Sequence, residues 1–269
     1  MNPLDAPRAS SLGATVQASV QNLIQPGGGM RIDEATCTGC QECLAYCPVG
    51  AILPADGVVA IDEERCVECG TCLRAAPCPA DAIYRQPEAF EWPRSVRTAF
   101  SDPLVPHKET GVRGRGTEEV KTNDVTGRVK RGRVGMAMEF GRPGVGTDFI
   151  DVEKMTVALA RLGVNFEPSN PLTFLMEDPR TGKIRDDVKG ERVLSAIVEF
   201  ETDPARLPDV VPVVLEVAKE IKSVFSWCAI TRIGPGRSIP IMRQLRELGL
   251  NPRVNAKVNV GLGRPLARD

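Results

Sequence analysis

Eight of the nine cysteines follow two copies of one spacing, which is typical of thiolate ligands to iron–sulfur clusters. In the first copy the cysteines stand at i, i+3, i+6 and i+10 before a proline. The second copy keeps the first two intervals and lengthens the last by two residues. The copies are Cys37, Cys40, Cys43 and Cys47, and Cys66, Cys69, Cys72 and Cys78. Because a loop of this kind curls round one cubane with three thiolates, the pattern predicts two [4Fe-4S] clusters.

The residues around the cysteines repeat as well. Ile32-Asp33-Glu34 corresponds to Ile61-Asp62-Glu63, and Ala51-Ile52 corresponds to Ala82-Ile83. The offset is 29 residues over most of the repeat and 31 after the insertion before Cys78. Self-similarity at a fixed offset indicates an internal duplication.

The fourth ligand of each cluster is expected from the opposite copy. In the run C-x2-C-x2-C-x3-C-P, the last cysteine ligates the other cluster. One cluster is therefore predicted on Cys37, Cys40, Cys43 and Cys78, and the other on Cys66, Cys69, Cys72 and Cys47. This crossover would tie the two halves together, since roughly 55 residues bury little core of their own.

Residues 31–86 resemble the two-cluster 2[4Fe-4S] bacterial ferredoxins. The first copy matches their run residue for residue, whereas the second has five residues, not three, between Cys72 and Cys78. The resemblance implies a ferredoxin module that passes single electrons at low potential to a redox partner protein or a reductase subunit.

Other uses of cysteine fit this pattern less well. Zinc sites use separated C-x-x-C pairs that close one tetrahedron, and a disulfide framework needs an oxidising compartment. The ninth cysteine, Cys228, lies in an apolar run over 224–230 and is expected to be a small residue of the core.

Composition excludes some partners and locations. The net charge is −1, so no nucleic-acid partner is expected, and no apolar run reaches the ~18–20 residues of a membrane span. Residues 1–30 lack the pattern of a secretory signal and are expected to form a mobile leader. We therefore expect a cytoplasmic, metal-binding protein with reduced thiols.

Charge is unevenly distributed. Residues 31–88 hold ten acidic and four basic residues, whereas residues 108–133 hold eight basic and four acidic ones. An acidic module offers a docking face to a basic redox partner, although a solvated surface explains the count equally well.

A connector rich in glycine, proline and arginine is expected over residues 87–132. It contains the only histidine, His107, which we expect to be a solvated linker residue. A single histidine argues against a His-based catalytic triad.

Residues 133–269 are predicted to form an α/β plait domain. Its elements alternate as βαββαβ followed by αβ, the order of a ferredoxin-like plait, which gives the chain an α+β fold with the dicluster module in front. The predicted strands are 133–140, 171–176, 193–200, 224–233 and 254–260, and the predicted helices are 151–162, 209–222 and 238–250.

Two glycine-rich loops of this domain precede helices and carry an arginine. They are Gly141–Thr147, with Arg142, and Gly234–Ser238, with Arg237. Such a loop either holds an anion at a helix N-terminus or is an ordinary strand-to-helix turn. The topology predicts that the two loops lie at opposite edges of the sheet.

A second resemblance concerns the chain from residue 31 onward. The segments 113–128 and Met138-Glu139-Phe140-Gly141-Arg142-Pro143-Gly144 are similar to the region after the ferredoxin module in 6-hydroxynicotinate reductases. The resemblance implies an iron–sulfur oxidoreductase, or its electron-donating subunit, that reduces a heteroaromatic carboxylate. It also implies a flavin, for which the sequence has no recognisable motif.

An anionic substrate of that kind would be bound by arginine, whose planar fork pairs with carboxylates. The candidates are Arg113, Arg115, Arg128 and Arg142. The alternative is a non-catalytic ferredoxin whose plait senses a ligand or docks a partner.

Overall fold

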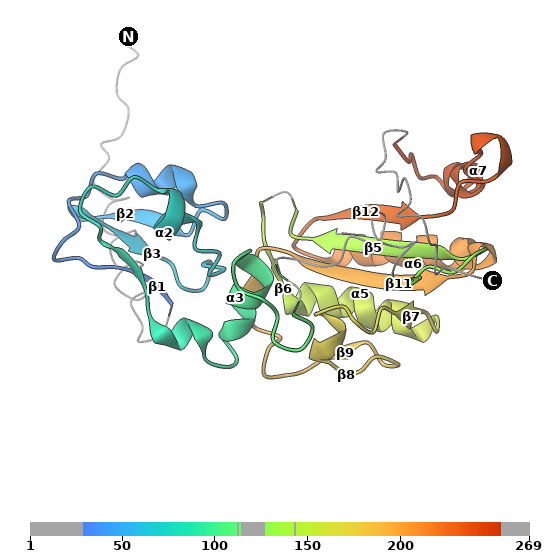
Figure 1. Ribbon diagram of the computed structural model, residues 1–269, viewed down its shortest axis with the longest axis horizontal. Coiled ribbons are helices and arrows are strands. Elements are labelled where there is room, and N and C mark those ends of the chain that lie inside the picture. The colour runs from blue at the N-terminus through green and yellow to red at the C-terminus, as the bar shows by residue number, and fades with distance from the viewer. Residues whose placement is uncertain (1–28, 112, 114–126, 143, 254–269) are drawn as a thin grey trace, which may run out of the picture.

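The computed structural model describes residues 29–111, 113, 127–142 and 144–253. Two parts with separate hydrophobic cores lie side by side in Figure 1, and helix α3 lies between them. The described residues contain both helices and strands, so the fold is α+β.

The N-terminal part consists of two small antiparallel sheets and two short helices. Strand β1 pairs with β4, and β2 pairs with β3 across a tight turn at Asp56-Gly57. In each copy one helix begins after the second cysteine and contains the third. The bounds are β1 Met30–Ile32, η1 Glu42–Tyr46, β2 Ile52–Ala55, β3 Val58–Ile61, α2 Thr71–Ala75 and β4 Ile83–Arg85.

The core of this part is small and includes the cysteines themselves. Its buried members are Met30, Cys43, Ala51, Ile52, Val59, Ile61, Cys66, Cys72 and Ile83. A core of this size gives a module little stability of its own, so bound metal is expected to supply much of it.

The segment predicted as a connector begins with two short helices. It contains η2 (Pro87–Phe90) and α3 (Ser95–Ser101). Val96 and Phe100, one helical turn apart, are buried in the core of the C-terminal part, while Arg97 bonds to backbone carbonyls of the N-terminal part. Helix α3 therefore joins the two parts.

The C-terminal part is built on one four-stranded antiparallel sheet. The strand order is β12-β5-β11-β7, with α5 between β5 and β7 and α6 between β11 and β12. The bounds are β5 Val134–Phe140, α5 Phe149–Arg161, β7 Asn165–Phe166, β11 Ala196–Thr202, α6 Leu207–Glu220 and β12 Phe225–Ile230. The apolar sides of the two helices pack with the sheet in one core.

Smaller elements surround this sheet. Strand β6 pairs with β10, and β8 pairs with β9. The bounds are β6 Thr147–Asp148, η3 Thr173–Leu175, β8 Met176–Asp178, β9 Lys183–Ile184, β10 Arg192–Val193, η4 Pro204–Arg206, η5 Pro235–Arg237 and α7 Ile241–Glu247.

The strand predicted over residues 171–176 is wrong. The sheet instead takes its edge strand from β7, and the apolar run forms the single turn η3 before β8. Asn170 directs this turn, because its side chain accepts a hydrogen bond from the Leu172 amide at 2.8 Å. A short apolar run does not distinguish a strand from a buried turn. The strand predicted over 254–260 lies outside the described residues.

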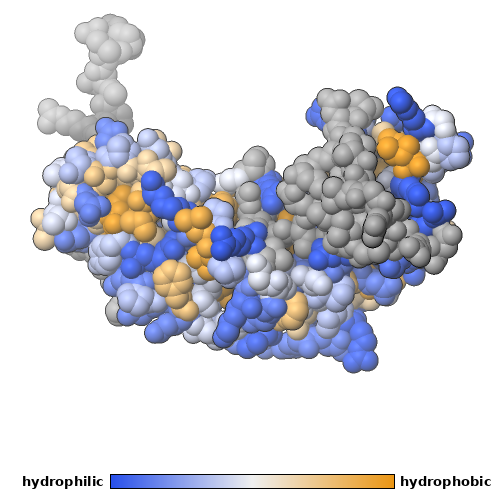
Figure 2. All heavy atoms as spheres, in the orientation of Figure 1, coloured by the Kyte–Doolittle hydropathy of each residue, from blue (hydrophilic) through white to orange (hydrophobic). Residues whose placement is uncertain are grey.

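Two predictions about exposure are also wrong. Cys228 is exposed on β12, because alternate residues of that edge strand face away from the helices. His107 is only 5% exposed and makes an edge-to-face contact with Phe100, with a ring-centroid distance of 5.6 Å. Figure 2 shows apolar residues at the surface of the N-terminal part.

Burial lowers the pKa of His107, and Glu109, 3.3 Å from its Nδ1 atom, only partly opposes this shift. The folded state therefore prefers the neutral imidazole, so folding stability is complete above the unfolded-state pKa of about 6.5 and falls as the pH drops below it. We expect the histidine resonance in an NMR titration to titrate below that value, and His107→Gln to reduce the loss of stability in acid. A resonance that titrates at or above about 6.5 would contradict the burial.

None of the helices among residues 29–111, 127–142 and 144–253 combines the length and the apolar character needed to cross a membrane.

Candidate metal centres

Both cysteine loops begin with the same aspartate-directed turn. In the first, the Cys37 amide donates to the Asp33 carbonyl at 2.9 Å, and in the second the Cys66 amide donates to the Asp62 carbonyl at 2.9 Å. Each aspartate side chain also accepts a backbone hydrogen bond two residues further on. These turns lead the chain from the end of β1 or β3 into the loop that carries the first cysteine of each copy.

The loops also repeat an uncommon backbone conformation. Gly39 and Gln41 have φ angles of 66° and 63°, and the equivalent residues Glu68 and Gly70 have 57° and 66°. Left-handed residues before and after the second cysteine bend the chain sharply. A helix then begins immediately, with the third cysteine, Cys43 or Cys72, buried inside it.

Gly39 is required by a close approach as well as by its φ angle. A Cβ atom at this position would lie 2.3 Å from the carbonyl oxygen of Gly57 in the β2–β3 turn. We expect Gly39→Ala to lower the free energy of unfolding by about 1–2 kcal/mol for the left-handed backbone and by about 1–3 kcal/mol more for the clash. The measurement is chemical denaturation together with the iron content.

Gly57→Ala is the matched control for this variant. Gly57 has a φ angle of 74°, but a Cβ atom there would meet nothing within 4 Å. Only the backbone cost of about 1–2 kcal/mol is expected. Equal losses in the two variants would show that the contact with the hairpin turn carries no energy.

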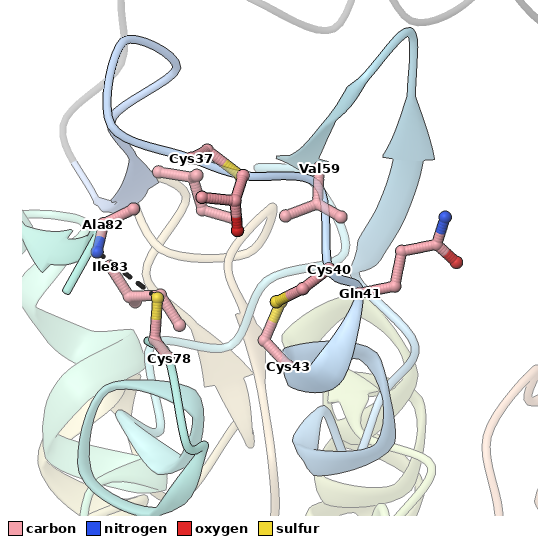
Figure 3. A pocket seen from close by; sticks show the side chains of 10 residues that line it. Cys37, Cys40, Gln41, Cys43, Val59, Cys78, Ala82 and Ile83 are labelled. Atoms are coloured by element: carbon pink, nitrogen blue, oxygen red, sulfur yellow. Dashed lines mark hydrogen bonds between the residues drawn. The ribbon is translucent and has the colours of Figure 1, made fainter. Parts of the chain in front are cut away.

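Site 1 is the set Cys37, Cys40, Cys43 and Cys78, and these side chains line one cavity. Three come from the first copy and the fourth from the second, as Figure 3 shows. The other walls are largely apolar and include Ile32, Val59 and Ile83. The Cys78 sulfur accepts a hydrogen bond from the Ala82 amide at 3.3 Å. Amide donors of this kind tune a thiolate ligand's charge.

Site 2 is the set Cys47, Cys66, Cys69 and Cys72. The pKa of the Cys72 thiol is raised to about 12, first by burial and then by its neighbours Cys69 and Cys47. Cys47 therefore lies with the cysteines of the second copy. Its sulfur accepts a hydrogen bond from the Ala51 amide at 3.1 Å, which repeats the contact between Cys78 and Ala82.

Burial likewise raises the pKa of the Cys43 thiol in site 1 and raises that of Cys66 well above its usual value. Thiols of this kind stay protonated near neutral pH unless a cation compensates the thiolate charge. Cysteine thiolates are a ligand set that suits iron, and iron binding would release the thiol protons. Within the part of the chain that the structure describes, no three Cys, His, Asp or Glu side chains converge tightly enough to chelate one ion.

The arginines predicted to bind substrate do not form one site. Arg142 follows β5 and lies at the end of the sheet nearer the N-terminal part, where it pairs with Glu139 at 2.6 Å. Arg128 lines a cavity at the other end of β5. Arg113 forms an isolated bridge with Pro106 and is exposed, and Arg115 lies outside the described residues.

The cavity beside Arg128 is unsuited to a carboxylate. Its lining includes Glu167, Glu199 and Glu201, and Arg128 itself lies 3.4 Å from Glu167. The glycine-rich loops Gly141–Thr147 and Gly234–Ser238 follow β5 and β12, which are antiparallel neighbours. They therefore lie at opposite edges of the sheet, as predicted.

Sequence reasoning missed a group of charged residues behind the second loop. Arg74, Arg85 and Arg97 donate to carbonyl oxygens of the second copy, and Glu68 is completely buried between two cysteines of that copy. The one signal available was Glu68 itself, which stands where the first copy has glycine.

Comparison with known proteins identifies the kind of domain that the N-terminal part forms. The family model of a 4Fe-4S dicluster domain matches residues 29–79, which include all eight cysteines of the repeat. No curated protein matches the chain. Residues 29–79 therefore form an iron–sulfur domain of the electron-transferring kind, and the match does not extend to the sheet.

Proposed function

We propose that this chain is a low-potential iron–sulfur electron-transfer protein that binds one [4Fe-4S] cluster at site 1 and one at site 2. The observation that carries the proposal is the cavity lined by Cys37, Cys40, Cys43 and Cys78, because cysteines from both copies meet there. Clusters held by four thiolates transfer single electrons at low potential. The chain's own residues supply the thiolates, the amide donors to sulfur and the apolar walls.

The sheet domain, residues 133–269, is proposed to be a ferredoxin-like α/β plait that follows a connector over 87–132. The antiparallel order β12-β5-β11-β7, with helices in two of its connections, supports this assignment. The assignment of eight cysteines to cluster ligation rather than to disulfides suits a reducing compartment such as the cytoplasm.

The proposed reaction is the reduction of a heteroaromatic carboxylate such as 6-hydroxynicotinate, by this chain or by an enzyme for which it is the electron-donating subunit. The support is the resemblance of segments 113–128 and 138–144 to those reductases, to which the comparison with curated proteins adds nothing. Of the four candidate arginines, Arg142 is the best placed, because its loop packs against the segment after Cys47. A Cβ atom added at Gly146 would lie 3.4 Å from Cγ1 of Val49.

The direct test is an anaerobic assay of the purified chain with 6-hydroxynicotinate and a dithionite-reduced carrier. Substrate-dependent oxidation of the carrier supports the reductase, and Arg142→Ala should then raise KM with unchanged iron content. Arg180→Ala is the control, since the Arg180 side chain is 90% exposed and pairs only locally with Asp178. Reversible bleaching without turnover would favour the alternative, a ferredoxin whose plait senses a ligand or docks a partner.

A further inference from the structure

The two sites differ sharply in exposure, although their loops are copies of one another. In the first loop Thr38, Cys40 and Gln41 are exposed. In the second loop every residue from Cys66 to Gly70 is buried. Residues 94–102 contact the second loop: Arg94 pairs with the buried Glu68, and Arg97 donates to the Cys66 carbonyl.

Three arginines hold the covered loop by its backbone. Nη1 of Arg97 donates to the carbonyl oxygens of Glu63 and Cys66, both at 2.7 Å. Nη2 of Arg85 donates to the Glu68 carbonyl at 3.0 Å, and Nη2 of Arg74 donates to the Cys69 carbonyl at 2.7 Å. We call Arg74, Arg85 and Arg97 the arginine clamp.

The positive charges of the arginine clamp are paired with two carboxylates, the buried Asp102 and the half-buried Glu191. Oδ2 of Asp102 accepts from both Arg74, at 2.9 Å, and Arg85, at 2.8 Å, while Arg97 pairs with Glu191. Burial opposes ionisation of Asp102, but hydrogen bonds from Leu104, Arg74 and Arg85 outweigh it and hold its pKa below the usual value. The charges of Arg85, Arg97 and Asp102 are screened little by solvent, so each acts strongly on a nearby site, whereas Arg74 is more exposed.

Gly70 allows the clamp to approach. A Cβ atom at this position would lie 2.4 Å from Nη1 of Arg74 and 2.5 Å from Nη2 of Arg85. At the equivalent position the first copy has the exposed residue Gln41. The second loop is thus suited to burial, whereas the first loop has a side that is exposed to solvent.

The sheet domain contacts neighbours of site 2 at two places. Arg97 links the Cys66 carbonyl to Glu191, which immediately precedes β10. On the other side, the Gly141–Thr147 loop packs against Pro48 and Val49, the two residues after Cys47. Site 2 therefore lies next to the C-terminal part.

The exposed surface around site 1 is negatively charged. Residues 32–64 include acidic residues but neither lysine nor arginine. Glu34, Glu42 and Asp56 of this segment are exposed. A carrier that docks beside Cys40 would therefore meet a negative surface, which attracts a basic partner.

We propose that a basic one-electron carrier docks at site 1. Site 2 is then an interior relay that passes the electron toward the sheet domain, and Arg97 sets the reduction potential of site 2. The proposal rests on the proposed function, since both sites must hold clusters. With clusters bound, one electron would pass from the carrier to site 1 and from site 1 to site 2, and site 2 would be reoxidised by the substrate or partner of the proposed function. Between the carrier and site 2, no covalent bond forms or breaks and no proton is transferred. Arg97 is a positioning residue, because it acts through the Cys66 carbonyl and its own charge.

The test is an EPR-monitored redox titration of the whole protein in the presence of a water-soluble dysprosium chelate. In protein poised at about one electron per chain, where the two sites are not both paramagnetic, the chelate should speed the relaxation of one signal, which identifies the exposed site 1, and leave the other unaffected. Arg97→Gln should lower the potential of the unaffected signal only, because loss of a nearby cation disfavours the reduced site. A shift of about 59 mV changes the electron's equilibrium distribution between the sites about tenfold.

Two further variants distinguish an effect of the Arg97 charge on the potential from an effect of Arg97 on the structure. Arg97→Lys should restore most of the potential, and Glu191→Gln should raise it, since the charge of Arg97 is then uncompensated. If Arg97→Gln does not fold, the potential measured in Glu191→Gln still tests the proposal. Arg180→Gln is the control, with no shift expected for an exposed side chain.

Equal sensitivity of both signals to dysprosium, or a shift of the exposed signal or of both signals in Arg97→Gln, would overturn the relay. So would unchanged potentials in Arg97→Gln and Glu191→Gln. A wild-type protein without two clusters would instead defeat the proposed function itself.

Discussion

Replacing Cys37 and Cys78 together by serine should remove about four irons and leave one intact cluster. Replacing Cys37 and Cys47 together should remove nearly all the iron. The first pair belongs to site 1 alone, because both residues line one cavity. The second pair takes one ligand from each site, and a cluster held by four thiolates tolerates the loss of one ligand poorly.

This pair of double variants tests the crossover directly, since each has two serines and differs only in which last cysteine is replaced. Iron and sulfide analysis of anaerobically purified protein provides the measurement. Cys228→Ser is the control and should retain full iron, because Cys228 is exposed on β12, away from both loops. If the first variant lost all the iron and the second kept half, each copy would hold its own cluster and the crossover would be wrong.

Removing iron should unfold the N-terminal part and leave the sheet domain folded. Cys43, Cys66 and Cys72 belong to the small core of the N-terminal part, whereas the sheet domain has a separate and much larger core. A ligand present at about a thousand times its dissociation constant stabilises the folded state by about 4 kcal/mol. Loss of a tightly bound cluster should therefore reduce amide protection in residues 30–85 by about a thousandfold or more.

Hydrogen exchange followed by mass spectrometry distinguishes the two parts. Peptides from β5 and β11 should keep their protection after iron is removed, because these strands pair along seven residues each and are buried by α5 and α6. Protection should return on anaerobic reconstitution with iron and sulfide. Unchanged protection of β1 to β4 in the iron-free protein would contradict the claim that clusters complete this core.

The sequence predicted the cysteine loops well because their chemistry is local. The ligand spacing and the 29-residue offset between Cys37 and Cys66 required no knowledge of distant contacts. Strands β5 and β12 and helices α5 and α6 were also predicted close to their observed bounds, since their apolar patterns are long.

Predictions failed where a distant residue decides the outcome. His107 is buried because Phe100 and Phe174 pack around it, and neither contact follows from the local proline-rich sequence. The run 171–176 is a turn because Asn170 binds both the Leu172 amide and Glu199, which lies on another strand. The clamp on the second loop was missed because Arg97 lies 31 residues from Cys66.

Iron and sulfide content together with the EPR spectrum of the dithionite-reduced protein, purified without oxygen, tests the central claim most directly. About eight irons per chain and a spectrum of two magnetically interacting S = 1/2 centres are predicted from ligation by eight thiolates. A colourless protein that carries zinc, or one with about four irons and a single isolated centre, would contradict the account.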